Sequence, residues 1–272
     1  MKSFKKNVDK LKTEWGKTPL ALVTGGSSGM GLRYAERLAE AGCDLLLVSN
    51  QQEALETTAA DLQSRYGVDV VARFQNLATA DAADDLYDFC KGNNLEVDIL
   101  ISNAGMFFFK ELTDENEPRM TTMNALHVIT PTRLMVKFGN DMKRRGHGFM
   151  LSVSSMAARL PVPGITTYSA TKAYLRSFGK SLSYEMRPYG VGMTTVCPGA
   201  IATPLYGLKP SLMNFGVKIG VIGTPEWLVG RALKGMFRKR RIVSPGFMNV
   251  YLPPLIAILP NGLVDYLWRK FK

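Results

Sequence analysis

Cysteine and histidine are scarce in this sequence, which holds three of the first and two of the second. Cys43, Cys90 and Cys197 are far apart and form no C-x-x-C pair, so neither a disulfide framework nor a zinc site is expected. His127 and His147 are too isolated to supply a ligand cluster. The composition therefore predicts no metal site and reduced thiols, as in a cytosolic protein.

Long apolar runs are also missing. No stretch of about 18 apolar residues occurs, so no membrane-spanning helix is expected. Residues 1–17 are basic but lack the apolar stretch that a signal peptide requires. We therefore expect a cytoplasmic protein with a basic N-terminal segment over 1–17, followed by one large domain.

Acidic residues are outnumbered, with 23 Asp and Glu against 34 Lys and Arg, which gives a net charge of +11. Six lysines lie within residues 1–17, and further basic runs occupy 238–241 and 269–272. This excess favours an anionic partner, such as a phospholipid surface or a phosphate-bearing ligand, or it serves only solubility. No nucleic-acid partner is expected, because the chain has no recognition motif.

Short apolar runs alternate with amphipathic stretches along the chain. Strands are expected over residues 20–23, 45–48, 68–74, 97–101, 149–153 and 191–196. Helices are expected over residues 32–41, 53–66, 80–90, 120–145 and 169–187, with Pro131 as a kink or turn in the fourth. This pattern predicts a single-domain α/β fold of the Rossmann type, in which helices cover both faces of a doubly wound parallel sheet.

A glycine-rich segment, T-G-G-S-S-G-M-G at residues 24–31, follows the first expected strand. Small residues let the backbone turn tightly and approach a pyrophosphate, and the following helix supplies free N–H groups. The spacing is G-x-x-x-G-x-G rather than G-x-G-x-x-G. A purely structural turn is the alternative, but the strand before it and the helix after it favour dinucleotide binding.

Tyr168 and Lys172 are four residues apart, so they share one face of a helix. A nearby cation lowers the pKa of a phenol, which can then exchange a proton with a substrate oxygen. The spacing alone is common on surface helices. Ser155 follows the strand expected over 149–153 and could polarise a carbonyl beside the phenol, although serines there also suit a turn or a helix cap.

Over residues 20–204 the sequence resembles the short-chain dehydrogenase/reductase family. Residues 24–31 are similar to its T-G-x-x-x-G-x-G turn, and Asn103-Ala104-Gly105 is similar to its N-A-G motif, with Ser102 where a second Asn is common. Asn124 matches the family's helix asparagine, and Ser155, Tyr168 and Lys172 match its catalytic residues. Pro198-Gly199 with Thr203 matches the loop over the nicotinamide.

This resemblance implies an oxidoreductase that moves a hydride between nicotinamide and a carbonyl or secondary alcohol. Tyr168 would be the general acid or base, and Ser155 would orient the substrate oxygen. Lys172 would bind the nicotinamide ribose and lower the tyrosine pKa, and Asn124 would hold a water in a proton relay. The implied cofactor-binding residues are Gly25, Ser27, Ser28, Met30, Gly31, Asn50, Asn76, Leu77, Asn103, Ala104, Gly105, Tyr168, Lys172, Pro198, Gly199, Ile201 and Thr203.

The cofactor preference depends on the end of the second strand, Val48-Ser49-Asn50. An acidic residue there would bind a free 2′-hydroxyl and disfavour a 2′-phosphate, but none is present. The arginine common in relatives is also missing. Asn50 with Ser27 or Ser28 can bind a phosphate as neutral donors, so NADP(H) is expected over NAD(H). Asn76 and Leu77 stand where an aspartate commonly faces the adenine.

The substrate side is expected in an apolar segment, residues 204–223, which in the family forms a lid. It favours a lipid-like substrate of hydroxysteroid, 3-ketoacyl or 3-ketosphingoid type, unless it simply packs on the body. The fold of an oxidoreductase is also compatible with a catalytically silent, dinucleotide-sensing protein, which is the alternative function.

The C-terminal extension, residues 247–272, lies beyond the catalytic domain expected over 18–246. It combines apolar residues with a basic rim, which suits contact with an anionic membrane surface, a cover over the substrate entrance, or a partner subunit. Its pattern most resembles hydroxysteroid dehydrogenases and long-chain 3-ketoacyl reductases. The usual assembly of the family also predicts a homo-oligomer.

Overall fold

The computed structural model describes residues 2–160, 162–203, 210–246 and 248–271. In these residues parallel strands form one seven-stranded sheet in the order β3-β2-β1-β4-β5-β6-β7. The strands are β1 Leu20–Thr24, β2 Asp44–Ser49, β3 Val70–Phe74, β4 Val97–Ser102, β5 Gly148–Val153, β6 Val191–Val196 and β7 Ile242–Val243. The predicted doubly wound sheet is confirmed.

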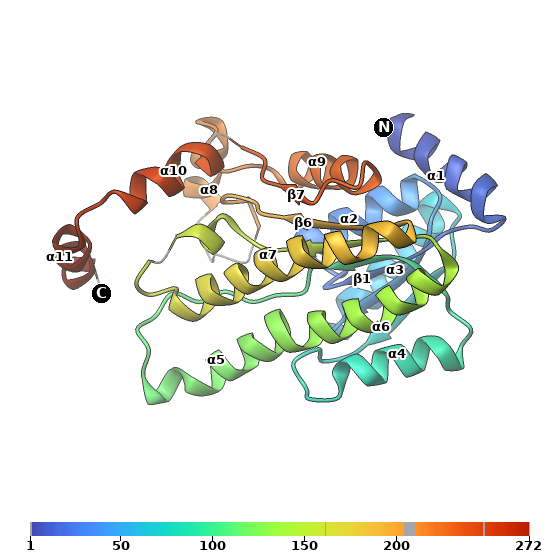
Figure 1. The fold of residues 1–272 in the computed structure, drawn as a ribbon, viewed down its shortest axis with the longest axis horizontal. Helices are drawn as coiled ribbons and strands as arrows, with labels where there is room; N and C mark the ends of the chain where they lie inside the picture. The colour runs from blue at the N-terminus through green and yellow to red at the C-terminus, as the bar shows by residue number, and fades with distance from the viewer. Residues whose placement is uncertain (1, 161, 204–209, 247, 272) are drawn as a thin grey trace.

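Helices cover both faces of this sheet (Figure 1). One face carries α1 Lys2–Trp15, α2 Gly29–Glu40, α3 Gln52–Tyr66 and α9 Pro225–Phe237. The other carries α4 Ala82–Gly92, α6 Thr130–Arg145 and α7 Thr166–Met186. The remaining helices are α5 Glu117–Asn124, α8 Pro210–Lys218, α10 Met248–Ala257 and α11 Asn261–Phe271, with short turns η1 Asp114–Asn116, η2 Ala125–Ile129, η3 Met156–Arg159 and η4 Arg187–Tyr189.

Strand β2 illustrates why the central strands are continuously apolar. Leu45 and Leu47 pack into the core on one face of the sheet, whereas Leu46 and Val48 pack into the core on the other. All four side chains are fully buried. A strand covered on both faces has no solvent side, so it shows no polar alternation.

The basic N-terminal segment forms helix α1 and packs on the domain. Val8 and Leu11 join the core beneath α2 and α9, and Trp15 stacks on His147 with 4.3 Å between ring centroids. Phe4 also packs against this core, and most of the other positions of the helix are polar or charged.

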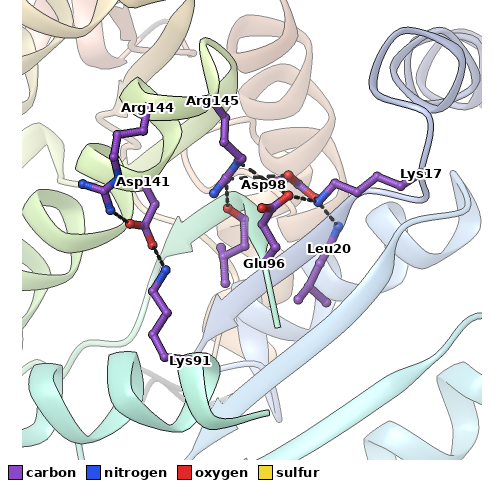
Figure 2. Close-up of polar contacts among 9 residues, drawn as sticks. Lys17, Leu20, Lys91, Glu96, Asp98, Asp141, Arg144 and Arg145 are labelled. Atoms are coloured by element: carbon purple, nitrogen blue, oxygen red, sulfur yellow. Dashed lines mark hydrogen bonds and ion pairs between the residues drawn. The ribbon is translucent and has the colours of Figure 1, made fainter. Parts of the chain in front are cut away.

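Polar contacts fix the end of α1 to the amino end of the sheet (Figure 2). The buried carboxylate of Asp98 accepts a hydrogen bond from the backbone N–H of Leu20 at 3.0 Å and pairs with Lys17 at 2.9 Å. Arg145 donates to the carbonyl of Val97 at 2.7 Å. These contacts lie at the edge of the sheet opposite the carboxyl ends of the strands.

The helix expected over 120–145 is interrupted by the π-helical turn η2. Pro131 lies at the start of α6, directly after the π-turn, and it has no N–H to donate to the carbonyls of that turn. The interruption therefore comes before the proline. It places His127, in the π-turn, against α7, as the contacts below show.

Candidate active site

A cavity of about 560 Å³ opens at the carboxyl ends of the central strands. Such crevices are where open α/β sheets bind ligands. Of the residues predicted to bind the cofactor, Gly31 and Gly199 are not among its walls, and the others all line it. It is also lined by residues that were not predicted to bind the cofactor: Gly29 of the glycine-rich segment, Val48, Ser49, Gln51, Gln75, Ala78, Met106, Thr122, Leu126, His127, Val153 and Ser154.

The glycine-rich turn requires its small residues for local reasons. The N–H groups of Gly25 and Gly26 both donate to the carbonyl of Val48, at 2.8 and 3.3 Å. Gly25 has a φ of +68°, a conformation that other residues rarely adopt. A Cβ on Gly31 would stand 1.9 Å from the carbonyl oxygen of Gly25. Gly31 therefore lets α2 begin directly against the turn, and its N-terminus faces the cavity region.

The Asn103–Gly105 segment is fixed to strand β1 through Thr24. The hydroxyl of Thr24 accepts hydrogen bonds from the N–H groups of Asn103 and Ala104, at 2.9 and 3.0 Å. The Asn103 side chain donates to the carbonyl of Thr24 at 3.1 Å. One threonine thus aligns two walls of the cavity, the glycine turn and the loop after β4.

The end of β2 carries a neutral polar cluster. The hydroxyls of Ser27 and Ser49 are 2.7 Å apart, and the N–H of Gln51 donates to Ser49 at 3.1 Å. The exposed Asn50 lies between these two residues in sequence. Among the described residues that line the cavity, none is acidic and only Lys172 is a fixed cation.

Tyr168 and Lys172 lie on α7, one turn apart, and both are buried. The ammonium of Lys172 donates to the carbonyl of Val153 at 3.0 Å and lies 5.5 Å from the centre of the Tyr168 ring. Ser155 follows β5 and its hydroxyl accepts a hydrogen bond from Ala157 at 3.1 Å. The structure therefore brings together three of the four predicted catalytic residues.

Burial shifts the pKa values of this group. Burial raises the pKa of Tyr168, and a hydrogen bond with Ser155 partly offsets this rise. Burial lowers the pKa of Lys172 to about 8. The predicted lowering of the tyrosine pKa by Lys172 is therefore not found in this arrangement: burial raises that pKa, Ser155 offsets part of the rise, and the lysine donates to Val153. A phenol that stays protonated at neutral pH is suited to donate a proton.

The fourth predicted catalytic residue, Asn124, is not brought to this site. Its side chain is exposed at the end of α5 and is not part of the cavity wall. The polar side chain that the π-turn directs inward is His127, which is 1% exposed and lines the cavity. The sequence motif identified an asparagine, but the π-turn determines which residue faces Tyr168.

The loop after β6 closes the cavity near α7. Pro198 accepts a hydrogen bond from the N–H of Met156 at 2.7 Å, which ties this loop to the segment after Ser155. Ile201 and Thr203 line the cavity, and Ile201 pairs with Gly223. The first part of the predicted lid, residues 204–209, lies outside the described residues, as do residues 247 and 272 of the predicted extension.

Comparison with known proteins identifies the family. The model of the short chain dehydrogenase family matches residues 19–211. The very-long-chain 3-oxoacyl-CoA reductase of Mus musculus is 34% identical over 245 residues, which cover 84% of this chain and 76% of the relative. The very-long-chain 3-oxoacyl-CoA reductase-A of Danio rerio is 34% identical over 94% of this chain and 80% of the relative.

A solved structure of a short-chain dehydrogenase from Sphingobium yanoikuyae in complex with NADPH superimposes with a TM-score of 0.75. It is 27% identical and the match covers 93% of this chain and 96% of that one. No comparison supports the catalytically silent alternative. With its glycine turn, its Ser155–Tyr168–Lys172 group and these matches, the chain belongs to the short-chain dehydrogenase family, as a nicotinamide-dependent oxidoreductase acting on alcohol and keto groups.

Proposed function

We propose that this protein uses NADPH to reduce the keto group of a long-chain 3-oxoacyl thioester. The observation that carries the proposal is the Tyr168 phenol buried in an apolar setting. Tyr168 packs with the buried side chains of Phe108 and Met123, and Phe107 lies edge-on to its ring at 5.0 Å. The names of the mouse and zebrafish relatives support this substrate class.

The residues present divide the chemistry between them. Bound nicotinamide supplies the hydride. Tyr168 would deliver its proton to the substrate oxygen, while the hydroxyl of Ser155 would orient that oxygen. Lys172 would contact the cofactor ribose from its position against Val153. The glycine turn, where a Cβ on Gly31 cannot fit, is the cradle for the pyrophosphate.

The preference for NADPH is part of this proposal. A 2′-phosphate would meet the neutral donors Ser27, Ser28 and Asn50 and no carboxylate. We expect Asn50→Arg to tighten NADPH binding and Asn50→Asp to tighten NADH binding relative to NADPH, measured by fluorescence titration. Tighter binding of NADH than of NADPH to the unchanged protein would defeat this part.

A substrate panel tests the reaction. NADPH oxidation is followed with 3-oxoacyl-CoA esters of short and long chains, and with steroid and sphingoid ketones as competing classes. We expect turnover to rise with acyl chain length, and Tyr168→Phe to abolish turnover while NADPH binding is retained. Activity confined to another ketone class, or independent of chain length, would reject the acyl substrate. Substantial turnover by Tyr168→Phe would reject the mechanism.

We also propose peripheral contact with an anionic membrane, for a cytoplasmic protein. Residues 18–203 hold 17 Lys and Arg against 19 Asp and Glu, whereas residues 1–17 and 204–272 hold 17 against 4. The helices α1, α9 and α10 from these terminal segments share the upper edge of the view in Figure 1. The extension adds exposed apolar side chains: Tyr251, Leu255, Ile258, Leu263, Tyr266 and Leu267. Positive charge beside exposed apolar groups supports an anionic lipid surface as the partner.

Among the described residues, no helix combines the length and apolar character needed to cross a bilayer. Co-sedimentation with vesicles therefore tests surface contact directly. We expect binding to vesicles rich in anionic lipid at low salt, weak binding to zwitterionic vesicles, and a loss of binding in the double variant Leu255→Ser and Ile258→Ser. Absence of binding at low salt would reject membrane contact.

We propose that the protein forms a homo-oligomer, because members of the family usually do. Helix α7 exposes Tyr174 and Tyr184, which are 38% and 53% exposed and are available for a subunit contact. Light scattering after size-exclusion chromatography should give a multiple of 30.0 kDa. A monomer at micromolar concentration would reject it.

A further inference from the structure

His127 is the buried polar side chain of the π-turn between α5 and α6. It is 1% exposed, and its ring lies 5.9 Å from the Tyr168 ring, edge to face. A π-turn widens the helix by one residue and often occurs at functional sites. Here the π-turn begins directly after the exposed Asn124 and contains His127, which contacts α7.

Both ring nitrogens of His127 are hydrogen-bonded, and the two bonds fix its tautomer. The N–H of Met106 donates to Nε2 at 2.9 Å, so Nε2 carries no proton. The proton of a neutral ring must then lie on Nδ1, which faces the hydroxyl of Thr171 at 3.1 Å. Thr171 in turn donates to the carbonyl of Tyr168 at 2.8 Å. The donors run in one direction from imidazole to hydroxyl to the tyrosine carbonyl.

These bonds connect two parts of the site. Met106 follows Asn103–Gly105, the cavity wall that Thr24 anchors from the other side. A Cβ on Gly105 would stand 2.9 Å from Nε2, so the loop approaches the imidazole this closely because residue 105 is glycine. Thr171 and Tyr168 belong to the catalytic helix. The imidazole therefore links the cofactor side of the cavity to the proton donor.

The charges around the ring favour its neutral form. Lys172 is the cation that faces it and Tyr168 is the other titratable neighbour, both on α7. Burial first, and Lys172 second, hold the pKa of His127 well below its usual value. A second proton would also face the N–H of Met106 and break that bond.

We propose that His127, not Asn124, is the residue of this helix that acts with Tyr168 and Lys172, as a neutral positioning residue that bridges the Met106 loop and α7. With both nitrogens bonded to protein groups, it fixes geometry rather than holding a relay water. This replaces the role that the resemblance implied for Asn124. The turnover readout below rests on the proposed reductase function, whereas the binding and tautomer readouts do not.

Two substitutions separate the two arms of the bridge. His127→Gln places an amide oxygen near the position of Nε2, so it keeps an acceptor for Met106 and loses the donor to Thr171. His127→Asn places an amide N–H near the position of Nδ1 and loses the Met106 contact. We expect His127→Gln to lower kcat about tenfold with little change in the Kd for NADPH. We expect His127→Asn to raise that Kd about tenfold with a smaller effect on kcat.

Asn124→Ala is the matched control for the assignment of the role. Because that side chain is exposed, kcat and the NADPH Kd should change less than about twofold. A tenfold loss of kcat in Asn124→Ala would return the role to the asparagine and overturn the proposal. Wild-type values in both His127 variants, or the same loss of kcat and of NADPH affinity in both, would overturn the bridge.

The tautomer is measured without any substrate. The sequence has two histidines, so ¹⁵N NMR of labelled protein gives two imidazole systems, and His127→Gln assigns them. We expect His127 to be neutral with the proton on Nδ1 throughout pH 6 to 8. An Nε2–H tautomer or a cation at neutral pH would overturn the proposal whatever the activity assays show. If only the turnover assays fail while the NMR result holds, the proposed substrate is at fault.

Discussion

Lys172→Met should make the protein more stable while abolishing turnover. The lysine is 5% exposed, and burial lowers its pKa from 10.5 to about 8, which corresponds to roughly 3 kcal/mol of destabilisation of the charged form at neutral pH. Methionine keeps the apolar stem but leaves the Val153 carbonyl without its donor, a loss of about 1–2 kcal/mol. The variant should therefore be about 1–2 kcal/mol more stable at pH 7.

Urea unfolding across a pH series tests this reasoning. The folded pKa of Lys172 lies below the unfolded value, so between about pH 8 and 10.5 the unfolded wild type holds more protons. In that range the free energy of unfolding of the wild type rises with pH, so the difference in stability between Lys172→Met and the wild type becomes smaller. Lys180→Met, at an exposed position of the same helix, should change stability by less than about 0.5 kcal/mol. A variant less stable than wild type at pH 7, or an advantage constant up to pH 10, would refute the argument.

Three further outcomes are expected. Gly31→Ala should weaken NADPH binding more than about tenfold in a fluorescence titration, because its Cβ meets the Gly25 carbonyl at 1.9 Å. Asp98→Ala should cost about 1–3 kcal/mol in urea unfolding with kcat unchanged, because it removes the acceptor of the Leu20 N–H and one of the two carboxylates that pair with Lys17, far from the site. The depressed His127 pKa means that stability falls as pH drops below about 6.5, and His127→Gln should flatten this decline in thermal melts.

The central sheet could be predicted because its strands are buried on both faces. Uninterrupted apolar runs such as 45–48, separated by amphipathic helical stretches, indicate buried parallel strands. Helix α1 was not predicted, because Phe4, Val8, Leu11 and Trp15, which pack on the core, are spaced among many lysines and other polar residues. Helix α9 was also missed, although Thr224 caps it and Pro225 follows at its first position, a start signal present in the sequence.

The features of the candidate site that depend on residue type and spacing could be predicted from the sequence. Tyr168 and Lys172 share a face because they are four residues apart on any helix. The partner of each group depends on the fold instead. Lys172 donates to Val153, and burial raises the tyrosine pKa despite the hydrogen bond with Ser155, because of how β5 and α7 pack together. The proposed role of His127 in place of Asn124 depends on a single π-turn, which has no reliable sequence signal.

The buried charged residues at the two ends of the sheet have different partners. At the amino end, the buried Asp98 has Lys17 and the Leu20 N–H as partners, so its charge is compensated (Figure 2). At the carboxyl end, no acidic residue lines the cavity among the described residues, and the buried Lys172 donates to a carbonyl and faces the Tyr168 ring. An acidic partner would stabilise the lysine but would also repel a phosphate-bearing cofactor. We infer that burying Lys172 against a carbonyl lowers the stability of the protein but leaves the cavity able to bind an anion, and the change in unfolding free energy of Lys172→Met measures that cost.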